Sequence, residues 1–248
     1  MNEHVSFDKY IINSTTVINS TTLREELQRL SDKEYKAFTE KLNPRVEHIL
    51  GVRIPALRKL AKQIARGDWK AYLDSAEDFY MEERMLHGLV LGYIKPDMGV
   101  EEYLQRVSAF VRIINCWAVC DCFSFAGGKV FAKQHEAVLW PYLKEWMQSD
   151  AEYEVRFGVV MAMKYFIDED HLDELFRCLD AIRQEKYYVK MAIAWAISVC
   201  FVCYPKQTMC FLHRNSLDDF TYNKALQKVV ESDRVSPDRK EKIRKMRR

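Results

Sequence analysis

The chain is poor in the residues that interrupt helices and build tight turns. Its 248 residues include only eight glycines and six prolines, whereas an all-β sandwich needs turn residues every ten or so positions. No apolar run approaches the roughly 18 residues that span a bilayer, and no N-terminal stretch has the pattern of a secretory signal. Hydrophobic residues nevertheless make up 48% of the chain. We therefore expect a folded, helical, cytoplasmic protein that is not inserted in a membrane.

The chain also lacks the cysteine pattern of a disulfide-bonded domain. Its seven cysteines are an odd number, and they lie inside apolar segments, which is typical of reduced, buried thiols. One spacing, Cys-x2-Cys-x6-Cys-x2-His, has the residue types of a zinc site and comprises Cys200, Cys203, Cys210 and His213. The first two lie in an apolar run without the glycines or polar residues of a metal knuckle. We therefore expect no metal, with zinc at these four residues as the alternative.

The net charge is small, but the charges are unevenly distributed. The formal charge is +2. The segment 51–66 contains five Lys or Arg and no acid, and the segment 238–248 contains seven Lys or Arg against two acids. Two basic patches on an otherwise acidic chain suit a polyanion that is held at particular places. Two solvated helix faces are the alternative.

Apolar residues recur with helical spacing along most of the chain. Pro55 suits a first helical position, and the apolar residues that follow it repeat at i, i+3, i+4 and i+7, with cations on the other side. We expect a loose arm or short helix over 1–21, a helical pair over about 23–42 and a basic helix or tail over 232–248. Further helices are predicted at about 55–66, 78–94, 99–113, 115–126, 129–148, 152–167, 169–184, 187–202, 205–214, 217–231 and 236–247.

A weak internal period indicates stacked helix pairs. Arg84, Arg156 and Lys190 each open a long apolar segment, and they are separated by 72 and 34 residues. Helical repeats of the HEAT kind have periods near 40 residues. We therefore expect one all-α domain over 1–248, an α-solenoid of about six HEAT-like antiparallel helix pairs. One helix from each pair would line a concave face that suits an extended partner.

Two side chains near residue 120 lie off the predicted core face of their helix. That face is the apolar stripe formed by Cys116, Val119, Cys120 and Phe123. Trp117 and Asp121 are four residues apart, so they share a different face and place an aromatic ring beside a carboxylate. The plain alternative is a half-buried tryptophan next to a solvated aspartate.

Two further residues stand out because of their apolar surroundings. Arg156 is the only charge in the segment 155–163, and a buried or groove-lining arginine needs an anionic partner. That partner is either a carboxylate, such as Asp121, or a phosphate that accepts hydrogen bonds from the planar guanidinium group. Trp195 lies in 191–204, which contains no charge, and a core position is the plain interpretation there.

Taken in order, these segments resemble the AlkD-type DNA alkylation repair family, whose members are alkylpurine DNA glycosylases built from HEAT-like repeats. The resemblance covers about 22–230. It rests on the segment 50–60 (LGVRIPALRKL), Trp117-x-x-x-Asp121, Arg156 in its apolar helix, and the segment 192–196 (AIAWA). It implies a monomeric, monofunctional hydrolase that cleaves the N-glycosidic bond of cationic alkylated purines, such as 3-methyladenine and 7-methylguanine. The implied partner is double-stranded DNA, and no cofactor is implied.

The resemblance also implies roles for individual residues. Trp117, Trp195, Asp121 and Arg156 match the two Trp, the Asp and the Arg that line the family's groove around the lesion. Asp121 would stabilise the developing sugar cation and orient the attacking water. The tryptophan rings would bind the cationic nucleotide, and Arg156 would bind a phosphate. Other expected DNA contacts are Arg53, Arg58, Lys59, Lys62, Arg66, Lys190, Arg244 and Lys245. The alternatives are a non-catalytic binder of damaged or branched DNA and a protein-binding HEAT scaffold.

Overall fold

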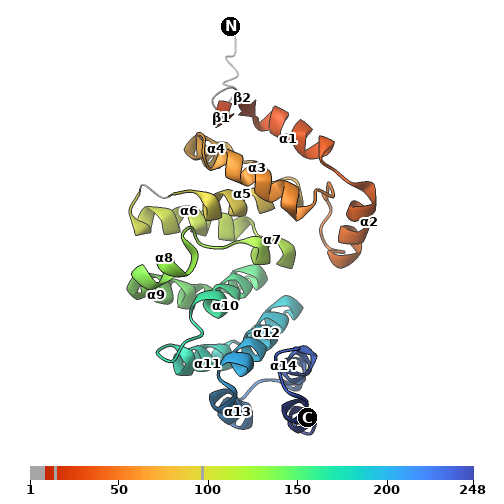
Figure 1. The fold of residues 1–248 in the computed structure, drawn as a ribbon, viewed down its shortest axis with the longest axis vertical. Coiled ribbons are helices and arrows are strands. Elements are labelled where there is room, and N and C mark those ends of the chain that lie inside the picture. Colours follow the sequence, from red (N-terminus) through yellow and green to blue (C-terminus); the bar gives the residue numbers. More distant parts are fainter. Residues whose placement is uncertain (1–8, 14–15, 96–97) are drawn as a thin grey trace. The chain divides into compact units, whose positions relative to one another are not determined.

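The computed structural model describes residues 9–13, 16–95 and 98–248 (Figure 1). Apart from one hairpin, the regular elements in these ranges are helices, which confirms the predicted all-helical repeat architecture. The structure divides into two compact units, Met1–Gln134 and His135–Arg248, and a single domain over 1–248 stays a prediction. Among the described helices, none combines the length and the apolarity that crossing a membrane requires.

The first unit is built around one layer of neighbouring helices. In this layer α3, α5 and α7 pack side by side in that order, and α6 packs against α5. The elements, in chain order, are β1 (Lys9–Asn13), β2 (Thr16–Asn19), α1 (Ser20–Arg29), α2 (Lys33–Leu42), α3 (Ile54–Ile64), α4 (Trp69–Ser75), α5 (Met81–Tyr93), α6 (Val100–Ile113), α7 (Trp117–Cys122) and α8 (Gly128–Gln134).

The hairpin corrects the sequence prediction for the N-terminal segment. β1 and β2 pair antiparallel, with Tyr10 opposite Ile18 and Ile11 opposite Val17, where a loose arm or short helix is predicted over 1–21. Isoleucine and valine branch at Cβ and therefore favour extended backbone. The helical prediction is wrong there because these branched residues favour extended backbone, and β1 also packs against α3 and α4. The parts of that prediction that concern residues 1–8 and 14–15 lie outside the described residues.

A buried carboxylate holds the loop that precedes α3. Glu82 is buried and accepts hydrogen bonds from the backbone N–H groups of Leu50, Gly51 and Val52 at 2.7 to 3.2 Å. Gly51 has a φ of +85°, and a Cβ at this position would lie 2.6 Å from Cβ of Lys36. Because three backbone donors depend on one carboxylate, Glu82 fixes how α2 and α3 meet α5. Sequence reasoning did not single it out, since an acid in a first helical turn is ordinary.

The second unit repeats the same construction. In it α10, α12 and α14 pack in succession as one layer, and α9, α13 and α15 pack against α10, α12 and α14 respectively. Its elements are α9 (Glu136–Met147), α10 (Glu152–Tyr165), α11 (Leu172–Ala181), α12 (Tyr187–Cys203), α13 (Pro205–Arg214), α14 (Asp219–Glu231) and α15 (Pro237–Arg244). Arg156 and Lys190 lie near the starts of α10 and α12. Their 34-residue spacing therefore corresponds to the number of residues from one helix of the layer to the next.

Two helix assignments differ from the sequence prediction. The single helix predicted at 129–148 is divided at His135, whose φ of −114° and ψ of 23° lie outside helical geometry, into α8 and α9. The short helix α4 was not predicted. It has seven residues, and its start is capped by Asp68, which accepts a hydrogen bond from the Ala71 N–H at 3.1 Å. Seven residues are too few for a helical period to be recognised.

Burial of His87 predicts that the protein loses stability at acid pH. The His87 ring is buried in α5 and stacks on Phe110 at 5.8 Å between centroids, and its Nδ1 has no hydrogen-bond partner among the described residues. Desolvation lowers the pKa of His87 from its ordinary 6.5 to about 4. The unfolded chain therefore binds a proton below pH 6.5 that the folded protein excludes. As the pH is lowered from 6.5 to about 4, the free energy of unfolding should therefore fall by roughly 1.4 kcal/mol for each pH unit.

A variant separates this effect from general acid denaturation. His87→Leu introduces an apolar side chain of similar size that cannot be protonated. Urea unfolding at a series of pH values should show a smaller loss between pH 6.5 and 4 in the variant than in the parent. Equal slopes in the two proteins would show that His87 is not the group responsible.

Candidate nucleic-acid site

Helix α7 carries Trp117 at its first residue and Asp121 one turn later. Both side chains are half-buried, and they lie away from the core stripe. That stripe is at most 2% exposed, which confirms the predicted core face; it consists of Cys116, Val119, Cys120 and Phe123. The Trp117 indole N–H donates a hydrogen bond to the Leu42 carbonyl oxygen at 3.3 Å, so the end of α2 holds the ring outside the core.

A cavity of about 270 Å³ opens beside Trp117 and Asp121. Its walls come from α2, α3, α5 and α7 and are mostly apolar. Helix α2 contributes Tyr35 and the 57% exposed Phe38, α5 contributes two methionines, and α3 contributes Arg58. The cavity therefore brings three aromatic rings, one carboxylate and one cation together within the first unit. Such a hollow suits a flat ligand that carries positive charge on its ring.

Sequence reasoning missed the contribution of α2. Tyr35 and Phe38 are three residues apart and stack at 6.3 Å between ring centroids. Their spacing on a short helix with few other apolar residues was a signal that they share one face. The sequence alone did not show that this face meets Trp117, which lies 75 positions beyond Leu42.

Arg156 and Trp195 belong to the second unit. Arg156 is only 5% exposed, and its Nη1 donates a hydrogen bond to the Tyr188 carbonyl oxygen at 2.9 Å, which ties α10 to the first turn of α12. An anionic partner for Arg156 stays a prediction. Trp195 is half-buried, although Ala194 and Ala196 on either side of it are fully buried. It lines a cavity of about 310 Å³ together with residues of α14.

The cations of α3 lie on the exposed side of an amphipathic helix, as predicted. Arg58, Lys59 and Lys62 are exposed, and the basic side continues to the exposed Arg66 just beyond the helix. The buried side consists of Leu57, Leu60, Ala61 and Ile64. This surface is free to meet a polyanion from solvent.

Other predicted DNA contacts are already paired with carboxylates. Arg53 contacts Asp32 at 2.7 Å. Lys190 contacts Glu185 and Asp218, and the hydrogen bond to Glu185 is the main cause that raises the pKa of Lys190. Lys245, which directly follows α15, contacts Glu241 at 2.8 Å, and Arg244 at the end of α15 is exposed. To bind a polyanion, each pair would have to exchange a carboxylate for a phosphate, so these paired cations are less available than unpaired ones.

The structure does not support the alternative of a zinc site at Cys200, Cys203, Cys210 and His213. Cys200 is buried, and burial raises the pKa of its thiol to about 12, which disfavours the thiolate that zinc requires. Cys203, Cys210 and His213 are exposed on α12 and α13. Within the described ranges, no three His, Cys, Asp or Glu side chains form a group that could hold a metal ion.

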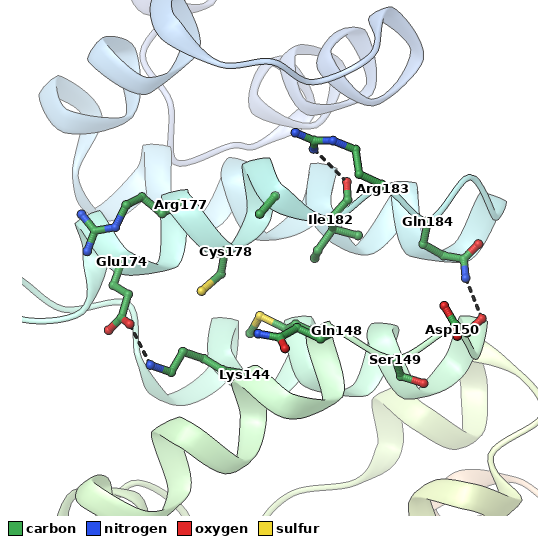
Figure 2. A pocket seen from close by; sticks show the side chains of 12 residues that line it. Lys144, Gln148, Ser149, Asp150, Glu174, Arg177, Cys178, Ile182, Arg183 and Gln184 are labelled. Atoms are coloured by element: carbon green, nitrogen blue, oxygen red, sulfur yellow. Dashed lines mark hydrogen bonds and ion pairs between the residues drawn. The ribbon is translucent and has the colours of Figure 1, made fainter.

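A cavity of about 620 Å³ lies on another part of the second unit, between α9 and α11 (Figure 2). Two of its polar side chains are held by partners: Lys144 contacts Glu174 at 2.7 Å, and the Gln184 amide donates to the backbone carbonyl oxygen of Asp150 at 2.7 Å. None of the predicted site residues, all of which the structure describes, lines this cavity. We therefore place the candidate chemistry at α7 and not here.

A family model described as "DNA alkylation repair enzyme" matches residues 23–229. No curated protein matches the chain. The matched range runs from α1 into α14 and includes Trp117, Asp121, Arg156 and Trp195.

Proposed function

Because the chain belongs to the family of DNA alkylation repair enzymes, we propose that it is a monofunctional DNA glycosylase. In this proposal it hydrolyses the N-glycosidic bond of cationic alkylated purines, such as 3-methyladenine and 7-methylguanine, in duplex DNA. Membership of the family gives a role in DNA repair with DNA as the partner. The observation that carries the proposed reaction is the placement of Trp117 beside Asp121 on the open face of α7, next to an apolar cavity.

The proposed chemistry uses a charge that the substrate already carries. An N-alkylated purine is cationic, so when the bond to the sugar breaks, the base takes the bonding electron pair and leaves as a neutral molecule. The positive charge passes to the sugar as an oxocarbenium-like ion, and water then adds to the sugar carbon and loses a proton. The Asp121 carboxylate stabilises that ion and orients the water. Its half-buried position strengthens the interaction, because solvent screens it less.

The aromatic rings hold the substrate in its charged form. A cation attracts the face of a tryptophan ring, so Trp117 favours the alkylated base over a neutral one. The attraction is lost when the base leaves as a neutral product, which favours release. The second unit contributes Trp195, whose half-buried ring gives a further aromatic contact to DNA. In the same proposal, Arg156 of this unit binds a DNA phosphate.

The proposal is tested by chromatography of the bases released from methylated duplex DNA. We expect free 3-methyladenine and 7-methylguanine and an abasic site for each base released, with unmethylated duplex as the control. Binding to damaged duplex without release would favour the non-catalytic alternative. Failure to bind DNA at any salt concentration would favour a protein-binding scaffold.

The basic side of α3 predicts a salt-dependent affinity for DNA. Lys59, Lys62 and Arg66 are exposed and do not line the cavity beside Trp117. Replacing all three with glutamine should reduce the slope of log affinity against log salt concentration by about 0.9 for each cation that contacts a phosphate. Fluorescence anisotropy with a labelled duplex at several salt concentrations measures this slope. An unchanged slope would show that these cations form only a solvated helix face.

A further inference from the structure

Four aromatic rings form a continuous row on the second unit. The Tyr153 ring lies 5.8 Å from the Tyr188 ring between centroids, Tyr188 lies 5.1 Å from Tyr187, and Tyr187 lies 6.0 Å from Phe220. We call these four residues the aromatic row. They occupy the first turns of α10, α12 and α14. The helical repeat therefore brings aromatic residues to the same position of three helices that are neighbours in one layer.

The aromatic row is open to solvent at one end. Tyr187 is 50% exposed and Phe220 is 40% exposed, while Tyr153 and Tyr188 are half-buried. The faces of these two adjacent rings leave an apolar patch exposed to water, and such patches mark binding surfaces. The row is therefore a candidate interaction surface outside the site on α7.

Positive charge gathers beside the exposed end of the row. Lys224 and Lys190 place their ammonium groups 5.9 and 6.0 Å from the centroid of the Phe220 ring. Lys190 is neutralised by Glu185 and Asp218. A cavity of about 380 Å³ next to Phe220 is lined by three cations and one acid: Lys224, Arg247, Arg248 and Asp219. The surface thus combines flat apolar rings with a net positive hollow.

We propose that the aromatic row binds unpaired nucleotides of DNA, with bases stacked on Tyr187 and Phe220 and phosphates held by Lys224, Arg247 and Arg248. Inside a duplex the bases expose only their edges, so away from the duplex ends a ring can stack only on bases that are unpaired. Aromatic rings with neighbouring cations are the features that bind single strands without sequence preference. A polyanion fits this surface better than an apolar protein partner, because three cations gather in the cavity next to the Phe220 ring.

The row lies close to a residue of the proposed function. Tyr188 and Trp195 are seven residues apart on α12, so they share a face and are separated by about 10 Å along the helix axis. Arg156 contacts the backbone of Tyr188. A single-stranded stretch on the row would therefore run next to Trp195. The inferred ligand is DNA with unpaired nucleotides, such as a gap or a fork, and binding it does not require base release.

The test uses the full chain and fluorescein-labelled oligothymidylate, with binding measured by fluorescence anisotropy. The double variant Tyr187→Ala/Phe220→Ala should weaken binding by about fivefold or more for each ring removed. Phe79→Ala is the matched control, because Phe79 is an exposed ring of the first unit and lies outside the row. It should bind as the parent does, and Tyr187→Trp/Phe220→Trp should retain affinity. Oligothymidylate contains no purine, so the result is independent of whether the chain releases alkylated bases.

A second variant tests the same surface without removing a ring. Lys224→Gln/Arg247→Gln should reduce the salt dependence of oligothymidylate binding by about 0.7 in slope for each phosphate that the variant no longer neutralises. Three results would each overturn the proposal. These are parental affinity in the double alanine variant, an equal decrease in Phe79→Ala, and an equal decrease in affinity for a blunt duplex.

Discussion

Replacing Asp121 with Asn should slow base release by about 10²–10³-fold, the usual effect of removing one group that stabilises a charged transition state. The variant should keep its fold and its affinity for DNA. Asn has the shape of Asp without its charge, and the Asp121 side chain lies off the buried stripe of α7. Single-turnover release of 7-methylguanine measures the rate, and near-UV circular dichroism measures the fold.

A matched control for this experiment is Asp173→Asn. Asp173 is an exposed carboxylate in the first turn of α11 and does not line the cavity beside Trp117. It should release 7-methylguanine at the parental rate. If Asp121→Asn also did so, the proposed role of Asp121 would be wrong.

Trp117→Ala should lose most base release yet remain nearly as stable as the parent. The Trp117 ring is half-buried beside a cavity and makes one hydrogen bond to the Leu42 carbonyl, so little core packing depends on it. Trp140 provides the contrast. It is buried in α9, lies 5.2 Å from Phe166 between ring centroids and donates a hydrogen bond to Glu174 at 2.6 Å. Trp140→Ala should cost roughly 3–5 kcal/mol of stability.

Thermal unfolding and base release, measured on the same preparations, separate the two cases. Trp195→Ala should lose activity with a stability loss between those of the Trp117 and Trp140 variants, because Trp195 is half-buried within an apolar helix. A Trp117→Ala protein that unfolded as readily as Trp140→Ala, but remained fully active when kept cold, would assign Trp117 to the core.

Local sequence patterns were sufficient for most of the helices and for the side of α7 that is buried. A helix buries residues that recur every three to four positions, so the stripe from Cys116 to Phe123 and the apolar side of α3 can be recognised without any knowledge of their partners. The same reasoning placed Trp117 and Asp121 off the core stripe, and the structure agrees. Their functional roles came from the family resemblance and stay predictions.

Periodicity failed where structure depends on residues distant in sequence. It did not reveal that Glu82 holds the backbone of Gly51, because one buried carboxylate looks like any acid in a first turn. It also gave no indication of the pairing of β1 with β2, since each strand is too short to show a clear pattern and gains its hydrogen bonds only from the other.

The sequence by itself determined the helices, their buried faces and the positions of the basic segments, because these depend on spacing along one element. The tertiary structure decided which faces meet. It placed Tyr35 and Phe38 beside Trp117, and it paired Lys190 with Asp218, which leaves that lysine less available to DNA. The physical reason is that a helical pattern reports that a face is apolar or charged, while the groups that cover or neutralise that face come from other elements of the fold.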